Sequence, residues 1–235
     1  MSALPSFSAT AFLLADPARA AMLTALLDGR ALPAGELAYA SGVTAQTASS
    51  HLAKLLEGGL VMVETEGRHR YYRLAGAHVA QALEHLAAIR PQAPARRQTL
   101  SPQVRQLRFC RCCYDHLAGQ VGVAVTQAMQ ARGYIAPAPD KRFTAPPAGL
   151  AWFGAIGLDV PAIKPTRRGL ARQCLDWTER THHLAGPLGV QLLRVFCESG
   201  WLRRAKDSRA VDVTPKGWLE LKRHFDLDEA TLRAA

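Results

Sequence analysis

The part of this 235-residue chain after residue 90 carries the residues whose types and spacing are best suited to chemistry. It holds all five cysteines, three of them within four consecutive positions. They are Cys110, Cys112, Cys113, Cys174 and Cys197. An odd number of cysteines, in a chain whose first residues lack the basic start of a secretory signal, argues against a disulfide framework. We therefore expect free, metal-binding or redox-active thiols.

Two Cys-x-Asp elements each stand ahead of a His-Leu-Ala-Gly sequence. The first leads from Cys113 to His116, and the second leads from Cys174 to His183. If the two segments pair in the fold, these four side chains converge. Two thiolates and two imidazoles form a good tetrahedral set for zinc. The sequence thus offers Cys113, His116, Cys174 and His183 as candidate metal ligands.

Other uses of the same region remain open. Cys110, Cys112 and Cys113 would supply the three thiolates that a soft trivalent metalloid prefers. Arg108 and Arg111 beside them would lower the pKa of a cysteine and favour a thiol that reacts with oxidants.

A structural or small-ligand role is a further alternative, because cysteine is among the most buried residue types. The two aspartates of the Cys-x-Asp elements would then cap helices or orient the histidines by hydrogen bonds. The residues available to such a thiol or ligand site are Cys110, Cys112, Asp115, Asp176 and Trp177.

A basic helix is predicted over about residues 102–113, in a stretch with no acidic residue between positions 91 and 114. It would extend a contact with phosphates or hold an acidic ligand. On a helix, Cys110, Cys113 and His116 would fall along one stripe, since they are spaced three and three. The same alternatives apply to a second basic loop, which contains Lys164, Arg167, Arg168 and Arg172.

The similarity between the two His-Leu-Ala-Gly elements continues in the residues that follow each of them, where Gly133 of the first segment matches Gly200 of the second. We therefore predict that residues 116–159 and 183–228 are two copies of one helix–strand–strand–helix unit. The glycines of His-Leu-Ala-Gly-x-x-Gly are expected where a helix packs closely. Two such units about a pseudo-twofold axis would enclose a cleft.

The first ninety residues predict a winged helix-turn-helix domain. Two short helices, over about 34–39 and 45–57, flank a turn that contains Gly42, which is the helix-turn-helix pattern. Two β-prone runs, 59–64 and 69–74, then flank a Glu-Gly tip. They predict a hairpin that follows the helices directly and forms a wing.

The second helix of the pair has the composition of a helix that contacts DNA bases. Its buried side is predicted to comprise Ala48, Leu52, Leu55 and Leu56, and its outer side carries short hydrogen-bonding groups. Short polar side chains let a helix enter the major groove and meet base edges. Arginines at the wing would reach phosphates or the minor groove. The candidate DNA-binding residues are Thr44, Gln46, Thr47, Ser49, Ser50, Lys54, Arg68 and Arg70.

In order and in combination, these motifs resemble the ArsR/SmtB family of winged-helix repressors over about residues 7–90. The resemblance implies a homodimer that binds a palindromic operator, releases it when an inducer binds, and pairs its subunits through the terminal helices. The Cys-x-Cys pair that metal sensors of the family often carry ahead of the recognition helix is absent from residues 35–40. The segments that carry the resemblance are Leu14-Ala15-Asp16-Pro17-Ala18-Arg19, Thr47-Ala48-Ser49-Ser50-His51-Leu52, Leu55-Leu56-Glu57-Gly58-Gly59-Leu60-Val61 and Gly67-Arg68-His69-Arg70-Tyr71-Tyr72-Arg73-Leu74.

Composition bounds the remaining possibilities. A hydrophobic share of 49% and a charged share of 20% are ordinary for a globular protein, and no apolar run is long enough to span a bilayer. We expect a cytoplasmic protein with no membrane partner.

The net charge of +10 lies wholly after residue 90, because the first ninety residues hold equal numbers of bases and acids. Phosphate-loop, dinucleotide-binding and Gly-x-Ser-x-Gly motifs are absent from the sequence, so no enzymatic activity is expected.

Together these patterns predict a mainly α protein with small β-wings, of the α+β class. Residues 1–90 form the winged helix-turn-helix, 91–101 a linker, and 102–235 a sensor domain that contains the repeat. The expected function is a homodimeric, sequence-specific repressor, released from double-stranded operator DNA by a small ligand, a metal or metalloid, or thiol oxidation. The competing expectation is a non-gated DNA-binding or architectural protein whose basic second half adds DNA or protein contacts.

Overall fold

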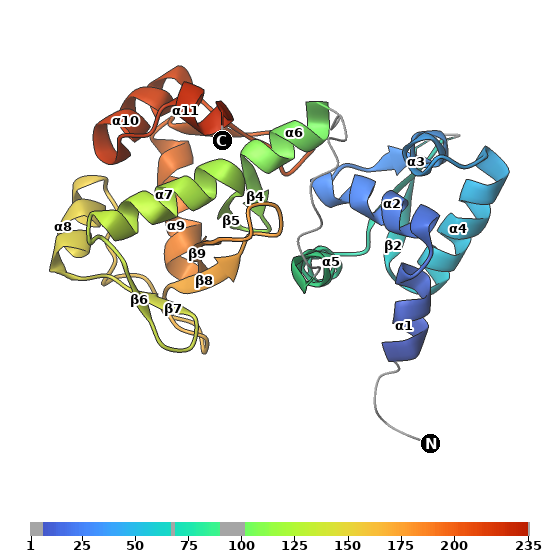
Figure 1. The fold of residues 1–235 in the computed structure, drawn as a ribbon, viewed down its shortest axis with the longest axis horizontal. Coiled ribbons are helices and arrows are strands. Elements are labelled where there is room, and N and C mark those ends of the chain that lie inside the picture. Colours follow the sequence, from blue (N-terminus) through green and yellow to red (C-terminus); the bar gives the residue numbers. More distant parts are fainter. Residues whose placement is uncertain (1–6, 67–68, 90–101, 235) are drawn as a thin grey trace. The chain divides into compact units, whose positions relative to one another are not determined.

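The computed structural model describes residues 7–66, 69–89 and 102–234 (Figure 1). The chain divides into two compact units, Met1–Leu83 and Glu84–Ala235. The division falls inside one helix, α5 (Ala77–Ile89). The predicted linker, 91–101, lies outside the described residues.

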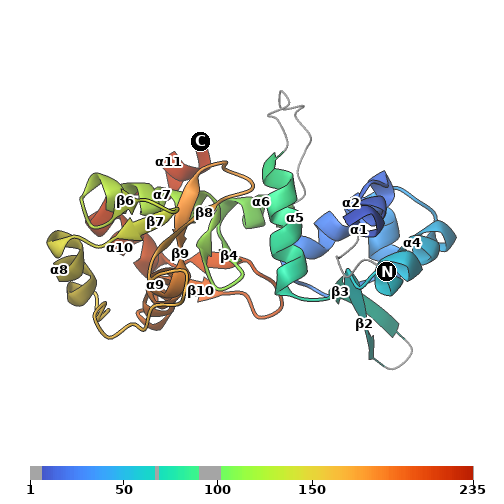
Figure 2. The ribbon, with the colours of Figure 1, turned by 90° about the horizontal axis from the view of Figure 1, so that it is seen from below.

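The first unit combines helices with a three-stranded antiparallel sheet of order β1-β3-β2. The β2–β3 hairpin projects from the helices (Figure 2), and the winged helix-turn-helix prediction is confirmed. The elements ahead of α5 are α1 (Phe7–Leu14), α2 (Pro17–Ala25), the 3-10 helix η1 (Leu26–Asp28), β1 (Leu32–Pro33), α3 (Ala34–Ser41), α4 (Ala45–Glu57), β2 (Val61–Glu66) and β3 (His69–Leu74).

Local sequence sets where these helices begin and end. The Asp16 carboxylate accepts a hydrogen bond from the Arg19 backbone N–H at 2.9 Å and caps α2. Helix α3 ends at Gly42, whose φ of +67° lies in the left-handed region that favours glycine. Thr44 then caps α4 by accepting a hydrogen bond from the Thr47 backbone N–H at 3.2 Å. The two helices of the helix-turn-helix are thereby separated by a tight turn.

Helices α2, α3 and α4 enclose the core of the first unit. Its most buried side chains are Met22, Leu23, Leu26, Leu37, Ala48, Leu52 and Leu55. Leu56 was predicted to share the buried side of α4, but it is 39% exposed. Because each residue turns about 100° around a helix, Leu56 lies beyond the face that Leu52 and Leu55 present to the core.

The second unit packs helices around short antiparallel strand pairs. Its elements are α6 (Pro102–Phe109), β4 (Arg111–Cys113), β5 (His116–Ala118), α7 (Gly119–Ala131), β6 (Ala136–Ala138), β7 (Arg142–Thr144), α8 (Pro147–Ala155), β8 (Arg172–Leu175), β9 (His182–Ala185), α9 (Gly186–Glu198), β10 (Leu202–Arg204), β11 (Val211–Val213), α10 (Pro215–Phe225) and α11 (Glu229–Ala234). Strands β6-β7-β8-β9 form one sheet, whereas β4–β5 and β10–β11 are separate pairs.

Two stretches of this unit follow the same order of elements. Strands β4 and β5, helix α7, strands β6 and β7 and helix α8 are matched in order by β8, β9, α9, β10, β11 and α10. Each stretch is therefore hairpin, helix, hairpin, helix. The unit predicted from the sequence was helix–strand–strand–helix. Its copies, 116–159 and 183–228, left out strands β4 and β8, and the residues expected to open the first helix instead lie in β5 and β9.

The basic helix predicted over about 102–113 is shorter in the structure, because α6 ends at Phe109. The prediction that Cys110, Cys113 and His116 share a helical stripe is therefore wrong. The Cys112 N–H donates to the Arg209 carbonyl, and the Cys110 carbonyl accepts from the Val211 N–H. These bonds to a distant segment hold the chain extended, which local spacing does not reveal.

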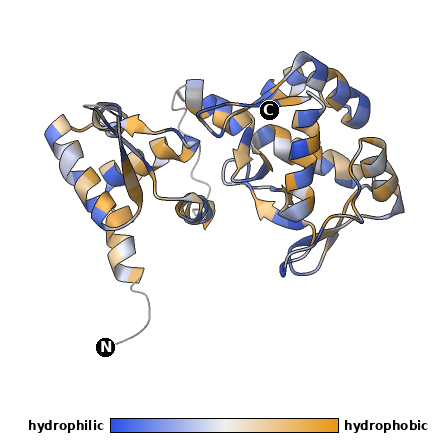
Figure 3. Cartoon of the chain, turned by 180° about the vertical axis from the view of Figure 1, so that it is seen from behind, coloured by the Kyte–Doolittle hydropathy of each residue, from blue (hydrophilic) through white to orange (hydrophobic). Residues whose placement is uncertain are grey.

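The core of the second unit lies between α7, α9 and the surrounding strands. Its largest fully buried side chains include Met129, Ile135, Phe153, Leu188 and Phe196. Much of helix α10, at the outside of the unit, consists of hydrophilic residues (Figure 3). In the part of the chain that the structure describes, no single helix is long and apolar enough to cross a membrane. The bent pair Phe7–Leu14 and Pro17–Asp28 reaches that length and apolarity only with its two helices taken together.

Candidate metal centre and DNA-contacting helix

Four side chains of the second unit come together from strands far apart in the sequence. Their potential ligand atoms all lie within 4.8 Å of one another. The two sulfurs are 4.0 Å apart, and the two histidine Nε2 atoms are 3.1 Å apart. Three of these residues are buried and one cysteine is half-buried. They are Cys113, His116, Cys174 and His183, the four residues that the sequence offers as candidate metal ligands.

Strand pairing explains why each hairpin supplies one cysteine and one histidine. In the β4–β5 hairpin Cys113 stands opposite His116, and in the β8–β9 hairpin Cys174 stands opposite His183. Residues directly opposite each other in an antiparallel pair project from the same face. Each hairpin therefore presents one Cys–His pair, and the site forms where the two pairs face each other.

The hairpins meet because the helix that follows each of them packs on the other. Helix α7, which follows β5, packs against β9, and helix α9, which follows β9, packs against β5 (Figure 1). The Thr126 hydroxyl of α7 accepts a hydrogen bond from the Leu184 N–H of β9 at 2.9 Å. This crossed packing brings β5 beside β9 and so places His116 against His183.

The shared His-Leu-Ala-Gly-x-x-Gly sequence has a structural role at both strand–helix junctions. Gly119 and Gly186 begin α7 and α9 with φ values of +77° and +78°, which favour glycine. Three residues on, a Cβ at Gly122 or Gly189 would come within 2.8 or 2.6 Å of the backbone of the preceding strand. The two glycines thus let the helix fold closely onto the strand that carries the histidine.

Each imidazole has an aspartate beside its Nδ1 atom, on the side away from the shared centre, and for His116 this contact is a hydrogen bond. The Nδ1 atom of His116 lies 2.7 Å from Asp115 Oδ1, and the Nδ1 atom of His183 lies 3.3 Å from Asp176 Oδ2. A carboxylate at Nδ1 fixes the tautomer in which Nε2 is free to bind a metal. Both rings therefore turn Nε2 toward the same point.

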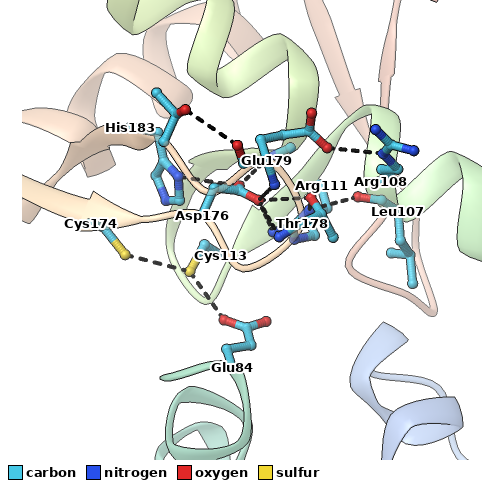
Figure 4. Close-up of polar contacts among 12 residues, drawn as sticks. Glu84, Leu107, Arg108, Arg111, Cys113, Cys174, Asp176, Thr178, Glu179 and His183 are labelled. Carbon is cyan, nitrogen blue, oxygen red and sulfur yellow. Dashed lines mark hydrogen bonds and ion pairs between the residues drawn. The ribbon is translucent and has the colours of Figure 1, made fainter. Parts of the chain in front are cut away.

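Asp176 is itself held by a dense set of donors (Figure 4). Its Oδ1 accepts from Arg111 Nη2 at 2.9 Å and from the Thr178 hydroxyl at 2.7 Å, and its Oδ2 accepts from the Gly119 N–H at 2.8 Å. The Asp176 and Arg111 side chains are 0% exposed. The Arg111 guanidinium also lies over the Trp177 ring, 5.3 Å from its centroid. Arg111 was predicted to lie beside reactive thiols and on the basic helix, whereas in the structure it supports the aspartate behind His183.

A buried glutamate completes the surroundings of one thiol. Cys113 Sγ donates a hydrogen bond to Glu84 Oε2 at 3.4 Å (Figure 4). The other carboxylate oxygen, Glu84 Oε1, lies 2.8 Å from Arg209 Nη2. Glu84 was not predicted at this site, because 29 residues separate it from Cys113 and nothing in its local sequence pattern indicates the contact.

These contacts set the proton affinities of the ligands. A hydrogen bond with Cys174, together with burial, raises the pKa of Cys113 to about 12. The same hydrogen bond lowers the pKa of Cys174 against the effect of burial. Burial opposes a charged His116, but hydrogen bonds with Asp115 and Cys113 raise its pKa to about 9. At neutral pH His116 and Cys113 therefore carry protons, which a metal ion that binds them must displace.

The donor set and its spacing suit a tetrahedral metal ion. Zn–S bonds of about 2.3 Å and Zn–N bonds of about 2.0 Å imply tetrahedral edges of about 3.8 Å between sulfurs and about 3.3 Å between nitrogens. The corresponding separations here are 4.0 and 3.1 Å. Small side-chain adjustments would complete the coordination, and the aspartates behind both histidines already supply the outer support that such sites use.

The other cysteines lie elsewhere. Cys110 is fully buried in the hydrophobic core, and burial raises the pKa of its thiol. Cys112 is also buried. Burial raises the pKa of its thiol, and the nearby Arg204 partly opposes this increase. Among the described residues, neither joins the cluster of potential ligands around Cys113. Strand β4 sends alternate side chains to opposite faces, so the three-thiolate arrangement of Cys110, Cys112 and Cys113 does not assemble.

In the first unit, α4 carries the candidate DNA-contacting residues on its exposed side. Thr44 is occupied as the cap, and the Ser49 hydroxyl donates a hydrogen bond to the Ala45 carbonyl at 2.9 Å. All six of the predicted residues at this helix are exposed: Thr44, Gln46, Thr47, Ser49, Ser50 and Lys54. Arg70 is exposed on β3, opposite Thr65 of β2, whereas Arg68 lies outside the described residues. A helix edged with short polar groups beside a hairpin is an arrangement that fits a DNA groove.

Comparison with known proteins agrees with this arrangement. Residues 14–64 match a family described as a helix-turn-helix domain. Nearly the whole chain is similar to the uncharacterized HTH-type transcriptional regulator YdfF of Bacillus subtilis, with 41% identity over 223 residues that cover 95% of this chain and 98% of that protein. The HTH-type transcriptional regulator CmtR of Mycobacterium tuberculosis is 46% identical over 76 residues, which cover 32% of this chain and 64% of CmtR.

Two solved structures match shorter parts of the chain. The cadmium metal-sensor CMTR of Mycobacterium tuberculosis has a TM-score of 0.32 and 36% identity, and covers 41% of this chain and 99% of its own. A homodimeric winged helix-turn-helix DNA-binding domain from Mycobacterium bovis has a TM-score of 0.34 and 29% identity, and covers 38% of this chain and 89% of its own. The relatives matched in sequence are all named as transcriptional regulators.

Proposed function

Because the chain belongs to the ArsR/SmtB family of winged helix-turn-helix transcriptional regulators, we propose that it is a repressor whose affinity for operator DNA is controlled by a metal ion. The metal binds in the second unit, to two thiolates and two imidazoles. One observation carries the proposal, namely the convergence of four potential ligand atoms within 4.8 Å of one another. The ligands are Cys113, His116, Cys174 and His183.

The chemistry of the donors favours a zinc-like ion of the Zn²⁺ or Cd²⁺ class. Thiolate sulfur and imidazole nitrogen select such borderline to soft metals, whereas Mg²⁺ and Ca²⁺ require oxygen ligands. Four protein ligands leave no open position for catalysis, as is usual in structural and regulatory sites. Bound at this place, the ion joins the β4–β5 hairpin to the β8–β9 hairpin and so fixes the two halves of the unit against each other.

Thiol oxidation is a second candidate for the controlling event, because Cys113 Sγ and Cys174 Sγ lie 4.0 Å apart. A hydroperoxide would take two electrons and two protons from the pair, leaving a disulfide, an alcohol and water. Both signals would act through the same two sulfurs, so bound metal should protect them from oxidation.

We infer that the working protein is a homodimer. Large apolar side chains of α1 and α5 are exposed in the single chain, including Phe7, 87% exposed, and Ile89, 76% exposed. Exposed apolar surface of this kind marks an interaction site. Two copies related by a twofold axis would present two recognition helices to a palindromic operator.

Metal content and DNA binding of the purified full chain test the proposal together. The DNA probe is a duplex that the full chain selects from a random-sequence pool. We expect one Zn²⁺ per chain, and operator affinity about 5- to 150-fold weaker with metal than after chelation, as for a typical allosteric coupling. Cys113→Ser and Cys174→Ser should bind the probe normally but lose both metal and response, while Cys197→Ser should behave as the natural protein. Equal DNA affinity with and without bound metal would refute metal control.

A non-gated DNA-binding protein gives a different result in the same experiment. It would show weak preference among sequences from the pool and no response to metal or to hydrogen peroxide. A response to peroxide alone, with a mass loss of about two hydrogens and no stoichiometric metal, would instead assign control to the Cys113–Cys174 disulfide.

A further inference from the structure

The net positive charge of the chain lies outside the winged helix-turn-helix, after residue 90. Residues 1–90 contain equal numbers of acids and bases, so the net charge of +10 belongs to the rest of the chain. From Lys141 to Leu175 the only acid is Asp159. The bases in that stretch are Lys141, Arg142, Lys164, Arg167, Arg168 and Arg172, and we call these six residues the basic surface.

Strand pairing and a tight turn bring most of the basic surface together. Arg142 of β7 stands directly opposite Arg172 of β8. A turn closed by the Thr166–Gly169 bridge places Arg167 and Arg168 at its corner. The Cβ position of Gly169 lies 3.5 Å from the Arg142 side chain, so this turn packs beside the β6–β7 hairpin. Figure 1 shows that hairpin extending away from α7 and α9.

These cations repel one another, and the described residues supply no acidic partner for them. Like charges placed directly opposite across two strands destabilise a sheet, and Arg142 and Arg172 are such a pair. None of the six bases forms an ion pair with any residue that the structure describes. Asp140, the nearest acid in sequence, lies exposed at the hairpin turn without an ion pair to a described residue. The arrangement therefore costs folding free energy, which a bound anion would offset.

We propose that the basic surface binds the phosphate backbone of DNA and adds a second, sequence-independent contact to that of the winged helix-turn-helix. Arginine pairs bidentately with phosphate, and four of the six bases are arginines. The chain is already a DNA-binding regulator, so DNA held by one unit is presented to the other at high effective concentration. The inference does not depend on the metal, because it rests only on charge and on the family.

The salt dependence of DNA binding measures this contact directly. The experiment compares the full chain with Arg167→Gln/Arg168→Gln on a mixed-sequence duplex of about 40 base pairs, from low to moderate salt. Each phosphate contact contributes about 0.9 to the slope of log affinity against log salt, so the double variant should lose about 1.8 from the slope. Its affinity at low salt should fall about tenfold.

The matched control is Lys206→Gln/Lys216→Gln, which removes the same charge from exposed positions elsewhere in the second unit. The control should change the slope by much less than the arginine variant. Equal slopes for all three proteins, or equal losses for the two variants, would overturn the proposal in favour of general electrostatic attraction. A loss seen with single-stranded RNA of the same length but absent with the duplex would also overturn it. Circular dichroism and metal content, unchanged in both variants, establish that the fold and the metal centre are intact, so failure here is separable from failure of metal control.

Discussion

The Nε2 atoms of His116 and His183 lie 3.1 Å apart, although 67 residues separate the two histidines in the chain. Each histidine stands on the second strand of a hairpin, opposite a cysteine. The two imidazoles face each other through their Nε2 atoms, and each has an aspartate beside its Nδ1 atom. This geometry lets both Nε2 atoms bind one metal ion. The relationship therefore joins the two halves of the second unit at the point where a ligand would act on both.

Cobalt substitution should reveal the ligand set by its colour. We expect the full chain to bind one Co²⁺ with the intense visible bands of a tetrahedral site and the near-ultraviolet bands of thiolate-to-metal charge transfer. Cys174→Ser should lose about half of the charge-transfer intensity and bind the metal at least tenfold more weakly. Cys197→Ser is the matched control. An octahedral spectrum without thiolate bands would exclude the proposed ligands.

The two aspartates behind the histidines should differ in their contribution to stability. Asp176 is fully buried with Arg111, whereas the Asp115 side chain is 50% exposed. Asp176→Asn leaves the Arg111 charge without its partner and should cost about 3–5 kcal/mol of unfolding free energy, while Asp115→Asn should cost under about 1 kcal/mol. Urea denaturation measures both. Each should weaken metal binding about 10- to 100-fold, and equal stability losses would contradict the asymmetry.

Metal binding should release protons and strengthen as the pH rises. The pKa values of about 9 for His116 and about 12 for Cys113 place a proton on each at neutral pH. A metal ion competes with these protons, so its affinity should rise by up to about tenfold per pH unit for each proton released. Calorimetry in buffers of different ionisation enthalpy counts the protons. A pH-independent affinity from about pH 6 to about pH 8 would exclude these two ligands.

Sequence discrimination should depend on the outer side of α4. Gln46 is exposed at the start of the helix, and Ser49 already donates its hydroxyl hydrogen to the Ala45 carbonyl. Gln46→Ala should therefore lose about 1–3 kcal/mol of discrimination against a mismatched base, and Ser49→Ala less. Gln127→Ala, an exposed glutamine on α7, serves as the control. Competition binding with single-base operator variants would show unchanged specificity if another element contacts the bases.

Arg70 on the wing should contribute to affinity without contributing to specificity. It is exposed on β3 and is expected to contact a phosphate. Arg70→Gln should weaken binding to all duplexes alike and reduce the salt slope by about 1. Fluorescence anisotropy across a salt series measures the change, and a loss confined to the selected operator would instead make Arg70 a base-contacting residue.

The first unit was largely predictable because its determinants are local. Thr44 and Gly42 set the helix-turn-helix by capping and by backbone conformation, and the Glu-Gly tip predicted the hairpin. Leu56 was misplaced because the sequence pattern alone does not define how wide a face the core covers. The four candidate ligands were also identifiable, since the repeated Cys-x-Asp and His-Leu-Ala-Gly elements mark equivalent positions.

The local structure that positions those ligands was not predictable. The helix predicted over 102–113 was expected to include Cys110 and Cys113, but hydrogen bonds to Arg209 and Val211 hold the chain extended after Phe109. Glu84 and Arg111 approach the site only through contacts that span the unit.

By itself, the sequence determined the winged helix-turn-helix and the identity of the four converging residues. Helix caps and turns depend on adjacent residues, and the repeated elements are found by comparing the sequence with itself. Only the tertiary structure decided that Cys113 and His116 face each other across a hairpin rather than along a helix. It also decided that Asp176 is held by Arg111 and that Arg142 is set against Arg172. The physical reason is that strand pairing and buried ion pairs join residues distant in sequence, and their partners are chosen by packing of the whole unit.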